Sequence, residues 1–301
     1  MKTIWFPMFV LLFYNAAQSL KECDHTYYKV EIWSNSKTLY IDCLKNCDDN
    51  NNSCQMKNCN LQHLNISDLV TKNCSSKDLL AFIDANTNIS LDSVTILEFN
   101  LYSKEDKTIK LSQGLFEKFP SLCQIHLRHA DLKLIGSEIE CPINFNQLII
   151  YRSNQAQLPI IIGSNITKLK IDMWPNLRNI SRISNFKNLE SFALKSKQEQ
   201  MIDLPENIFS KNDKLKELFF NRVSPIWNSN SFIGLNSLTK ITFWGCNFTT
   251  IPDRLFANTP GLKELIWEHD ICPENGERIM PNLMLDGTGI TKFVYQQKKQ
   301  T

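Results

Sequence analysis

Apolar residues recur along this chain in a unit of the form apolar-x-x-apolar-x-apolar, which returns through most of its length. Alternation at the end of each unit predicts a short strand whose first, fourth and sixth residues point inward. Successive units start 28, 23, 21, 23, 26, 23, 24 and 18 residues apart. The units begin at Val94, Leu122, Phe145, Ile166, Leu189, Leu215, Leu238 and Leu262, with a weaker ninth unit of Met280, Leu283 and Leu285.

The spacing predicts a solenoid of leucine-rich repeats, because seven of the eight intervals fall in the range of about 20 to 29 residues. The second halves of the units repeat as well, as in 113–116, 205–209 and 252–256, where a Leu-Phe or Ile-Phe pair fills the outer layer. No unit buries its apolar surface alone, so stacking must do it. We expect an α/β horseshoe with a parallel sheet on its concave face and eight to nine repeats over residues 91–288.

The two ends differ in character from the repeats. Residues 1–19 hold one basic residue, an apolar run and a small-residue end, which predicts a signal peptide. Residues 20–90 are rich in cysteine, and we expect them to form a disulfide-stapled cap over the first repeat. Residues 289–301 form a polar tail, and either a strand from Lys292 onward or a partner closes that end. No later window predicts a membrane span, so we expect a secreted, extracellular protein.

Ten cysteines remain after cleavage, an even number that indicates disulfides in an oxidising compartment. The disulfide candidates are Cys23, Cys43, Cys47, Cys54, Cys59, Cys74, Cys123, Cys141, Cys246 and Cys272. Cys123 and Cys141 could close one repeat, whereas Cys246 and Cys272 either form a cystine across two repeats or stay buried thiols. Glycosylation acceptors head seven Asn-x-Ser/Thr tripeptides: Asn51, Asn65, Asn73, Asn88, Asn165, Asn179 and Asn247.

The chain resembles the N-terminal part of an insect Toll-type receptor ectodomain in having a leader, a cysteine-rich head and repeats that carry Leu-Pro-x-x-Leu-Phe. The matching stretches are 204–209 through Leu218 and 251–256 through Leu265, and the likeness covers roughly residues 23–285. It implies affinity for cystine-knot cytokines of the Spätzle type, or for Toll receptor ectodomains. The family's transmembrane helix, signalling domain and last cysteine cluster are missing, which favours a soluble decoy or co-receptor.

Repeat geometry places positions two, three, five, seven and eight of each unit on the concave face, where such proteins hold their partners. Aromatic and apolar residues meet arginine there, which is typical of a contact hot spot. The predicted binding residues are Tyr151, Arg152, Phe219, Asn221, Arg222, Trp244, Ile266, Glu268 and His269. Alternatively, Phe219 or Trp244 turns inward as core. Position eight supplies a basic column of His129, Arg152, Arg222 and His269, which either meets an acidic ligand or is a solvated face.

Composition argues against several other functions. The net charge of +2 falls to +1 once Lys2 is removed, so nothing requires a nucleic-acid partner. We expect no metal, because His126 and His129 lie three apart on a strand and alternate between faces. We also expect no cofactor and no enzymatic activity, since the known catalytic motifs are missing. An extracellular matrix or adhesion protein and a truncated receptor ectodomain remain the alternatives to a soluble binding protein.

Overall fold

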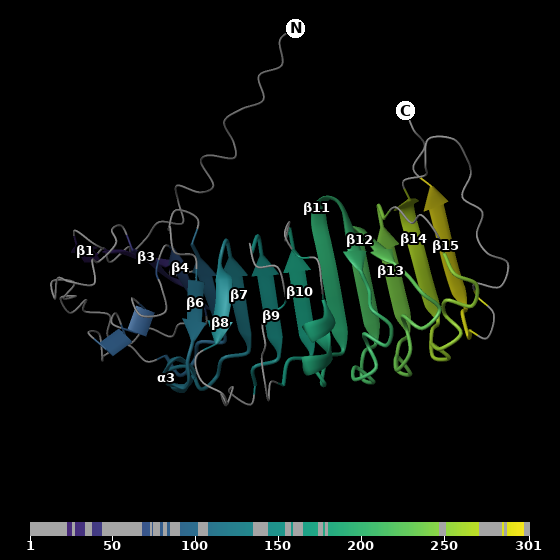
Figure 1. Cartoon of the computed structure of the whole chain (residues 1–301). Coiled ribbons are helices and arrows are strands. Elements are labelled where there is room, and N and C mark those ends of the chain that lie inside the picture. The colour runs from purple at the N-terminus through teal and green to yellow at the C-terminus, as the bar shows by residue number, and fades with distance from the viewer. Residues whose placement is uncertain are drawn as a thin grey trace, which may run out of the picture.

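Thirteen strands form one sheet in this computed structural model (Figure 1). The structure describes residues 23–25, 28–33, 38–43, 68–72, 74, 79–80, 83–84, 91–101, 108–134, 144–153, 158, 165–173, 177, 180–246, 251–270, 285 and 288–297. In sheet order the strands are β1 (Cys23–His25), β2 (Tyr28–Trp33), β3 (Thr38–Cys43), β4 (Asp68–Lys72), β5 (Ile96–Asn100), β7 (Gln124–Arg128), β9 (Gln147–Tyr151), β10 (Lys168–Asp172), β11 (Ser191–Asp203), β12 (Glu217–Ile226), β13 (Lys240–Trp244), β14 (Glu264–Asp270) and β15 (Lys292–Gln297).

The sheet changes from antiparallel to parallel within the head region. Strands β1, β2 and β3 pair antiparallel, and every later neighbouring pair, from β3 with β4 to β14 with β15, is parallel. Asp68 of β4 pairs with Ile96 of β5, so β4 is already in register with the repeats. The parallel sheet therefore starts before residue 91, in the stretch that the sequence pattern had assigned to a separate cap.

The eight strong units of the hydrophobic pattern are confirmed as eight consecutive strands, β5 to β14. Their fourth and sixth residues are at most 2% exposed, from Leu97 and Phe99 to Leu265 and Trp267. The ninth unit is wrong: Leu285 lies in a turn, and the next strand is β15, whose Lys292 pairs with Glu264. The strand from Lys292 onward therefore closes the C-terminal end of the sheet, which was one of the two alternatives given for that end.

The backbone repeats its hydrogen bonds from one strand to the next. The carbonyl of position two accepts the N–H groups of positions two and three of the next strand at 2.7–3.1 Å, from Thr95 to Lys263. At position eight the chain turns, with left-handed φ of 52° to 56° at His129, Arg152, Met173 and Arg222. Because these units share one geometry, the side chains at a given position form straight rows across the sheet.

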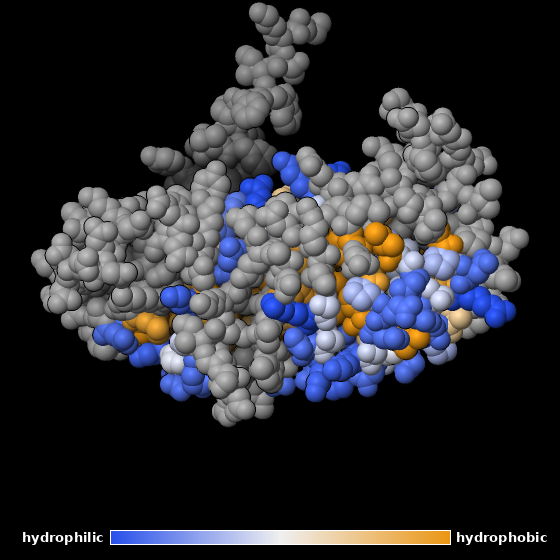
Figure 2. Space-filling model, in the orientation of Figure 1, coloured by the Kyte–Doolittle hydropathy of each residue, from blue (hydrophilic) through white to orange (hydrophobic). Residues whose placement is uncertain are grey.

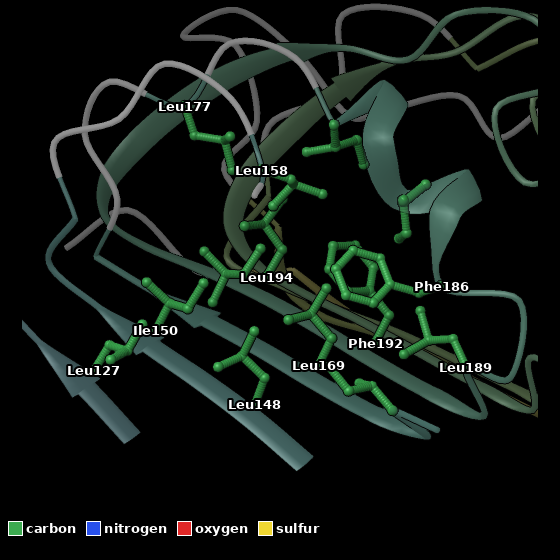
Figure 3. Close-up of a cluster of buried hydrophobic side chains, with 14 of the residues drawn as sticks. Leu127, Leu148, Ile150, Leu158, Leu169, Leu177, Phe186, Leu189, Phe192 and Leu194 are labelled. Atoms are coloured by element: carbon green, nitrogen blue, oxygen red, sulfur yellow. The ribbon is translucent and has the colours of Figure 1, made fainter. Parts of the chain in front are cut away.

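The side of the sheet that faces the core is covered by the segments that return the chain to the next strand. They include α3 (Gln113–Glu117), η1 (Ser181–Asn185), the small parallel sheet of β6 (Thr108–Leu111) and β8 (Asp131–Leu134), and several turns. Figure 3 shows Leu148, Leu169 and Phe192 pointing from adjacent strands toward Leu158 and Phe186 of the return segments. The core is therefore one continuous apolar layer rather than a series of separate cores.

Aromatic rings dominate the core of the C-terminal repeats. Phe220, Phe243 and Trp267 occupy position six of successive strands, with ring centroids 5.8 and 5.1 Å apart. Trp227 lies between this row and the outer layer, 5.6 Å from Phe243 and 4.9 Å from Phe232. It therefore ties the strand layer to the return layer through ring contacts, each of which adds about 0.5–1.5 kcal/mol.

Two buried contacts fix the return turns against one another. Asn212 is fully buried and its Nδ2 donates to the carbonyls of Ile183 (3.1 Å) and Phe186 (3.0 Å) in the preceding repeat. Gly234 has φ of +93°, and a Cβ there would lie 2.6 Å from the Cα of Ser210. Adjacent turns consequently approach closely enough that only glycine fits between them.

Candidate functional site

The face of the sheet opposite the core carries positions three, five and seven of every strand, and we call it the open face. Burial alternates along the strands, so these positions stay partly exposed while positions four and six are buried. The predicted concave-face rows are therefore confirmed for positions three, five and seven. Two groups of side chains stand out on this face, one polar and one apolar.

The polar group centres on Glu98, which contacts the side chains of Arg128 and His126 of the next strand. Arg128 Nε lies 2.7 Å from Glu98 Oε1, and His126 Nδ1 lies 3.6 Å from Oε2. Burial raises the pKa of the Glu98 carboxyl, but the hydrogen bond from His126 and the charge of Arg128 outweigh it and hold that pKa below its usual value of 4.5. Glu98 is thus charged at neutral pH and keeps Arg128 in place.

Tyr151 lies beside two guanidinium groups. The Cζ atom of Arg128 is 5.7 Å from the centre of its ring, and that of Arg152 is 5.2 Å away. The His129 ring also meets it edge-on, with centroids 6.0 Å apart. Cation–π contacts of this kind hold an arginine in place while leaving its N–H groups available to a ligand.

The apolar group is formed by Phe219, Trp244 and Ile266, which we call the apolar patch. Trp244 is 38% exposed, and Phe219 and Ile266 are partly exposed. Thr242 pairs with both Phe219 and Ile266 in the sheet and is only 9% exposed, because these larger neighbours cover it. None of the three patch residues has therefore turned into the core, and the inward alternative for Phe219 and Trp244 is wrong.

Exposed apolar surface is concentrated toward the C-terminal end. The large apolar residues that remain exposed among the described ones are Ile226, Trp244 and Phe293, in β12, β13 and β15. Figure 2 shows the side that carries the return segments, where hydrophobic surface is visible around β12 and β13 above hydrophilic turns. Of these three, Trp244 stands on the open face, whereas Phe293 pairs with the inward-pointing Leu265 and so lies on the other side of the sheet.

The remaining predicted binding residues do not form one site. Asn221 and Glu268 flank Trp244 in adjacent strands and belong with the apolar patch. His269 lies in β14, but its side chain is outside the described part of the chain. The discontinuous basic column at position eight does not form one row, because the chain turns there: Arg222 donates to the Lys197 carbonyl at 2.9 Å, whereas Arg152 lies over the Tyr151 ring of the open face.

The cysteine predictions divide into three groups. Cys74 is fully buried and disulfide-bonded. Cys123 and Cys246 are thiols, so the disulfide expected at Cys123 is wrong and the buried-thiol alternative is the one found at Cys246, whose Sγ donates to the carbonyl of Phe220 at 3.6 Å inside the core. The side chains of Cys23 and Cys43 and the residues Cys47, Cys54, Cys59, Cys141 and Cys272 lie outside the described part.

Of the glycosylation candidates, Asn165 is exposed just before β10, where an enzyme could reach it. The others, Asn51, Asn65, Asn73, Asn88, Asn179 and Asn247, lie outside the described residues, as does the expected signal peptide. Within the described ranges no three His, Cys, Asp or Glu side chains group as metal ligands. No helix in those ranges is both long enough and apolar enough to span a bilayer.

The sequence pattern missed the polar group, although the signal was present. Glu98 occupies position five of the first strong unit, and register places it directly beside His126 of the next. Reading position five across neighbouring units, instead of starting the row at His126, would have placed the Glu98 carboxylate beside the His126 ring. The stacking of Arg128 and Arg152 on Tyr151 depends on side-chain rotamers, which no periodicity predicts.

Comparison with solved structures gives similarity at low identity. The chain is similar to TLR13 in its complex with ssRNA13 (TM-score 0.51, 16% identity, 76% of this chain and 36% of that chain). It is also similar to a structure of the Drosophila Toll–Spätzle complex (0.45, 16%, 89% and 38%) and to CroV588, described as a circular LRR protein (0.41, 15%, 81% and 40%). The chain thus spans 36–40% of the length of these three.

These comparisons show the fold. The TLR13 likeness, together with the parallel sheet, identifies the fold as a leucine-rich-repeat solenoid, and the other two, with TM-scores below 0.5, add nothing to that assignment. No protein-family model matches the sequence, and no curated protein sequence matches it either. Since TLR13 is seen there with an RNA, the fold alone gives no reason to exclude a nucleic-acid ligand.

Proposed function

We propose that this protein is an extracellular, non-enzymatic binding protein that holds a partner protein on the open face of its sheet. The observation that carries the proposal is the apolar patch, in which Phe219, Ile266 and the 38% exposed Trp244 are held side by side on a rigid sheet. Rigid aromatic anchors lose little conformational entropy on binding, which is why they dominate the energetics of protein interfaces.

The partner class that the Toll-like repeat motifs favour is a cystine-knot cytokine of the Spätzle type, or a Toll receptor ectodomain. On this proposal the protein acts by occupancy: a partner bound to it cannot assemble with its receptor. The leader-like residues 1–19, the Asn-x-Ser/Thr tripeptides and the cysteine content support an extracellular location. A matrix or adhesion protein would use the same open face for a different partner.

The test is a binding experiment with the glycosylated protein recovered from the medium of eukaryotic cells. It is first used to capture partners from extracellular fluid, and then titrated with a purified Spätzle-type cytokine and with a Toll ectodomain. We expect saturable binding of one of these, weakened at least about tenfold by Phe219→Ala with Trp244→Ala. Recovery of matrix components in its place would favour the adhesion protein, and retention of the chain inside the cell would contradict an extracellular role.

A further inference from the structure

Positive charge on the open face is concentrated next to the apolar patch. Four cationic residues stand at the face positions and closing turns of β9, β10 and β11, and we call them the basic strip: Arg152, Lys168, Lys170 and Lys195. The same positions of these strands hold one carboxylate, Asp172. Since the whole chain carries a net charge of only +2, this concentration is a property of the fold rather than of the composition.

The cations of the basic strip differ from other cations of the sheet in their ion pairing. No carboxylate in the described part of the chain lies within ion-pair distance of them. By contrast, Lys216 lies 2.9 Å from Glu190, and Lys240 and Lys292 lie 3.8 and 3.7 Å from Glu264. Toward the N-terminal side, Arg128 is neutralised by Glu98. The positive potential of the open face is therefore strongest over β9 to β11.

The basic strip and the apolar patch are continuous. Lys195 Nζ lies 5.4 Å from the centre of the Phe219 ring, so the last cation of the strip touches the first residue of the patch. Between Lys170 and Phe219 the intervening residue in the sheet is Ala193, whose side chain is too small to separate them. One ligand lying across the sheet would meet both groups.

We infer that the basic strip binds an acidic segment of the partner protein while the apolar patch takes an apolar side chain of that same partner. The inference rests on the proposed function and names the chemistry of its ligand. Arginine held over a tyrosine ring is suited to carboxylates, because its guanidinium presents two parallel N–H groups to both oxygens. Beside it, Lys168 is exposed and Lys170 and Lys195 are partly exposed, and positive charges so placed raise the rate of encounter with an acidic surface.

A short acidic segment fits this face better than a long polyanion does. A nucleic acid or sulfated glycan lying across the sheet would have to pass Glu217 and Glu268, which stand at face positions of β12 and β14. Such carboxylates would repel a continuous row of phosphates or sulfates. A protein can place its carboxylates over the basic strip and present neutral, apolar side chains to the rest.

The experiment measures fluorescence anisotropy of the full-length protein with labelled peptides at low salt. The probe has four glutamates followed by a short Gly-Ser spacer and a leucine pair, and the control peptide has glutamine in place of glutamate. We expect the acidic probe to bind saturably and the glutamine peptide not to bind. The double substitution Lys168→Glu with Lys170→Glu should weaken the binding of the acidic probe at least about tenfold, and rising salt should weaken it in the parent. The matched control, Lys216→Glu with Lys240→Glu, should change the affinity by less than about twofold.

Each other outcome overturns the inference. If the glutamine peptide bound as tightly as the acidic probe, or if the control variant lost as much affinity as the Lys168→Glu, Lys170→Glu variant, the basic strip would not be the binding site. If a single-stranded RNA oligomer bound more tightly than the acidic probe, and this binding disappeared in the Lys168→Glu, Lys170→Glu variant, the basic strip would be a nucleic-acid site. If the captured partner protein binds the Lys168→Glu, Lys170→Glu variant as well as the parent, this inference fails while the proposed function stands. If neither the parent protein nor any variant captures a partner protein, the proposed function itself is contradicted.

Discussion

The Nζ atom of Lys195 lies 5.4 Å from the centre of the Phe219 ring, which places the last residue of the basic strip against the first residue of the apolar patch. Lys195 and Phe219 come from neighbouring strands, β11 and β12, and from positions seven and five of their repeats. A contact between a cation and an aromatic face keeps both side chains extended along the sheet. The open face is therefore one surface with a charged half and an apolar half.

Alternation along β12 and β13 allows a test with matched residues. Phe219→Ala and Trp244→Ala should each lower the free energy of unfolding by less than about 1 kcal/mol, because these side chains lie on the open face. Phe220→Ala and Phe243→Ala, one residue away in each strand and at most 1% exposed, should each cost about 3–5 kcal/mol. Urea unfolding followed by circular dichroism measures the difference. Equal losses at Phe219 and Phe220 would mean that Phe219 is core.

Gly234 should be the least replaceable of the described glycines. Its φ is +93° and the Cα of Ser210 lies only 2.6 Å from the place a Cβ would take, so Gly234→Ala must displace backbone. We expect a loss of about 1–3 kcal/mol in unfolding free energy. Gly114→Ala is the control, since Gly114 lies in α3 with open space around it and should gain stability or stay neutral. A neutral Gly234→Ala would show that the two turns are farther apart.

Glu98 should make stability depend on acid pH. Its folded-state pKa lies below the ordinary value of 4.5, so the carboxylate contributes stability that is fully present above that value and is lost as the pH falls through the folded pKa. Thermal unfolding at pH 7 and at about pH 3 measures the effect. Glu98→Gln should flatten this dependence and lower stability mainly at pH 7, where the ion pair with Arg128 is intact in the parent. An unchanged slope in the variant would contradict the assignment.

Cys246 should react with thiol reagents only after unfolding. It is fully buried, and its Sγ donates to a backbone carbonyl in the core, whereas Cys123 is half-buried at the start of β7. Alkylation of the native, unreduced protein followed by peptide mass spectrometry should label Cys123 first and Cys246 only in denaturant. A Cys246 peptide that carries no label in denaturant until a reductant is added would show that this residue forms a disulfide.

Most of the repeat architecture was predictable, because an inward residue at positions one, four and six leaves a periodic trace in the sequence. Strand β4 was not predicted, because Thr71 stands at position six, where the other units carry an apolar residue, and because the neighbouring cysteines suggest a separate module. The last strand was misplaced for a similar reason: Met280, Leu283 and Leu285 imitate the unit, but the chain reaches the sheet only at Lys292.

The sequence predicts which residues of the candidate site share a face of the sheet, but not which of these side chains contact one another. Strand alternation correctly gave Phe219, Trp244 and Ile266 to one face. It failed at position eight, where a left-handed residue such as Arg222 turns the backbone and interrupts the alternation. Ion pairs such as Glu98 with Arg128, and the pairing that leaves Lys168 and Lys170 without a carboxylate partner among the described residues, depend on which strands are neighbours and on side-chain rotamers.

The register of the sheet gives the binding face a length scale. Strands in a sheet are spaced by about 4.8 Å, and the four steps from Tyr151 in β9 to Trp244 in β13 therefore set these two residues about 19 Å apart. The hydrogen-bonded backbone keeps that interval from adjusting to the ligand. On the proposed function, a partner that contacts both Tyr151 and Trp244 must therefore present the two contacting groups about 19 Å apart.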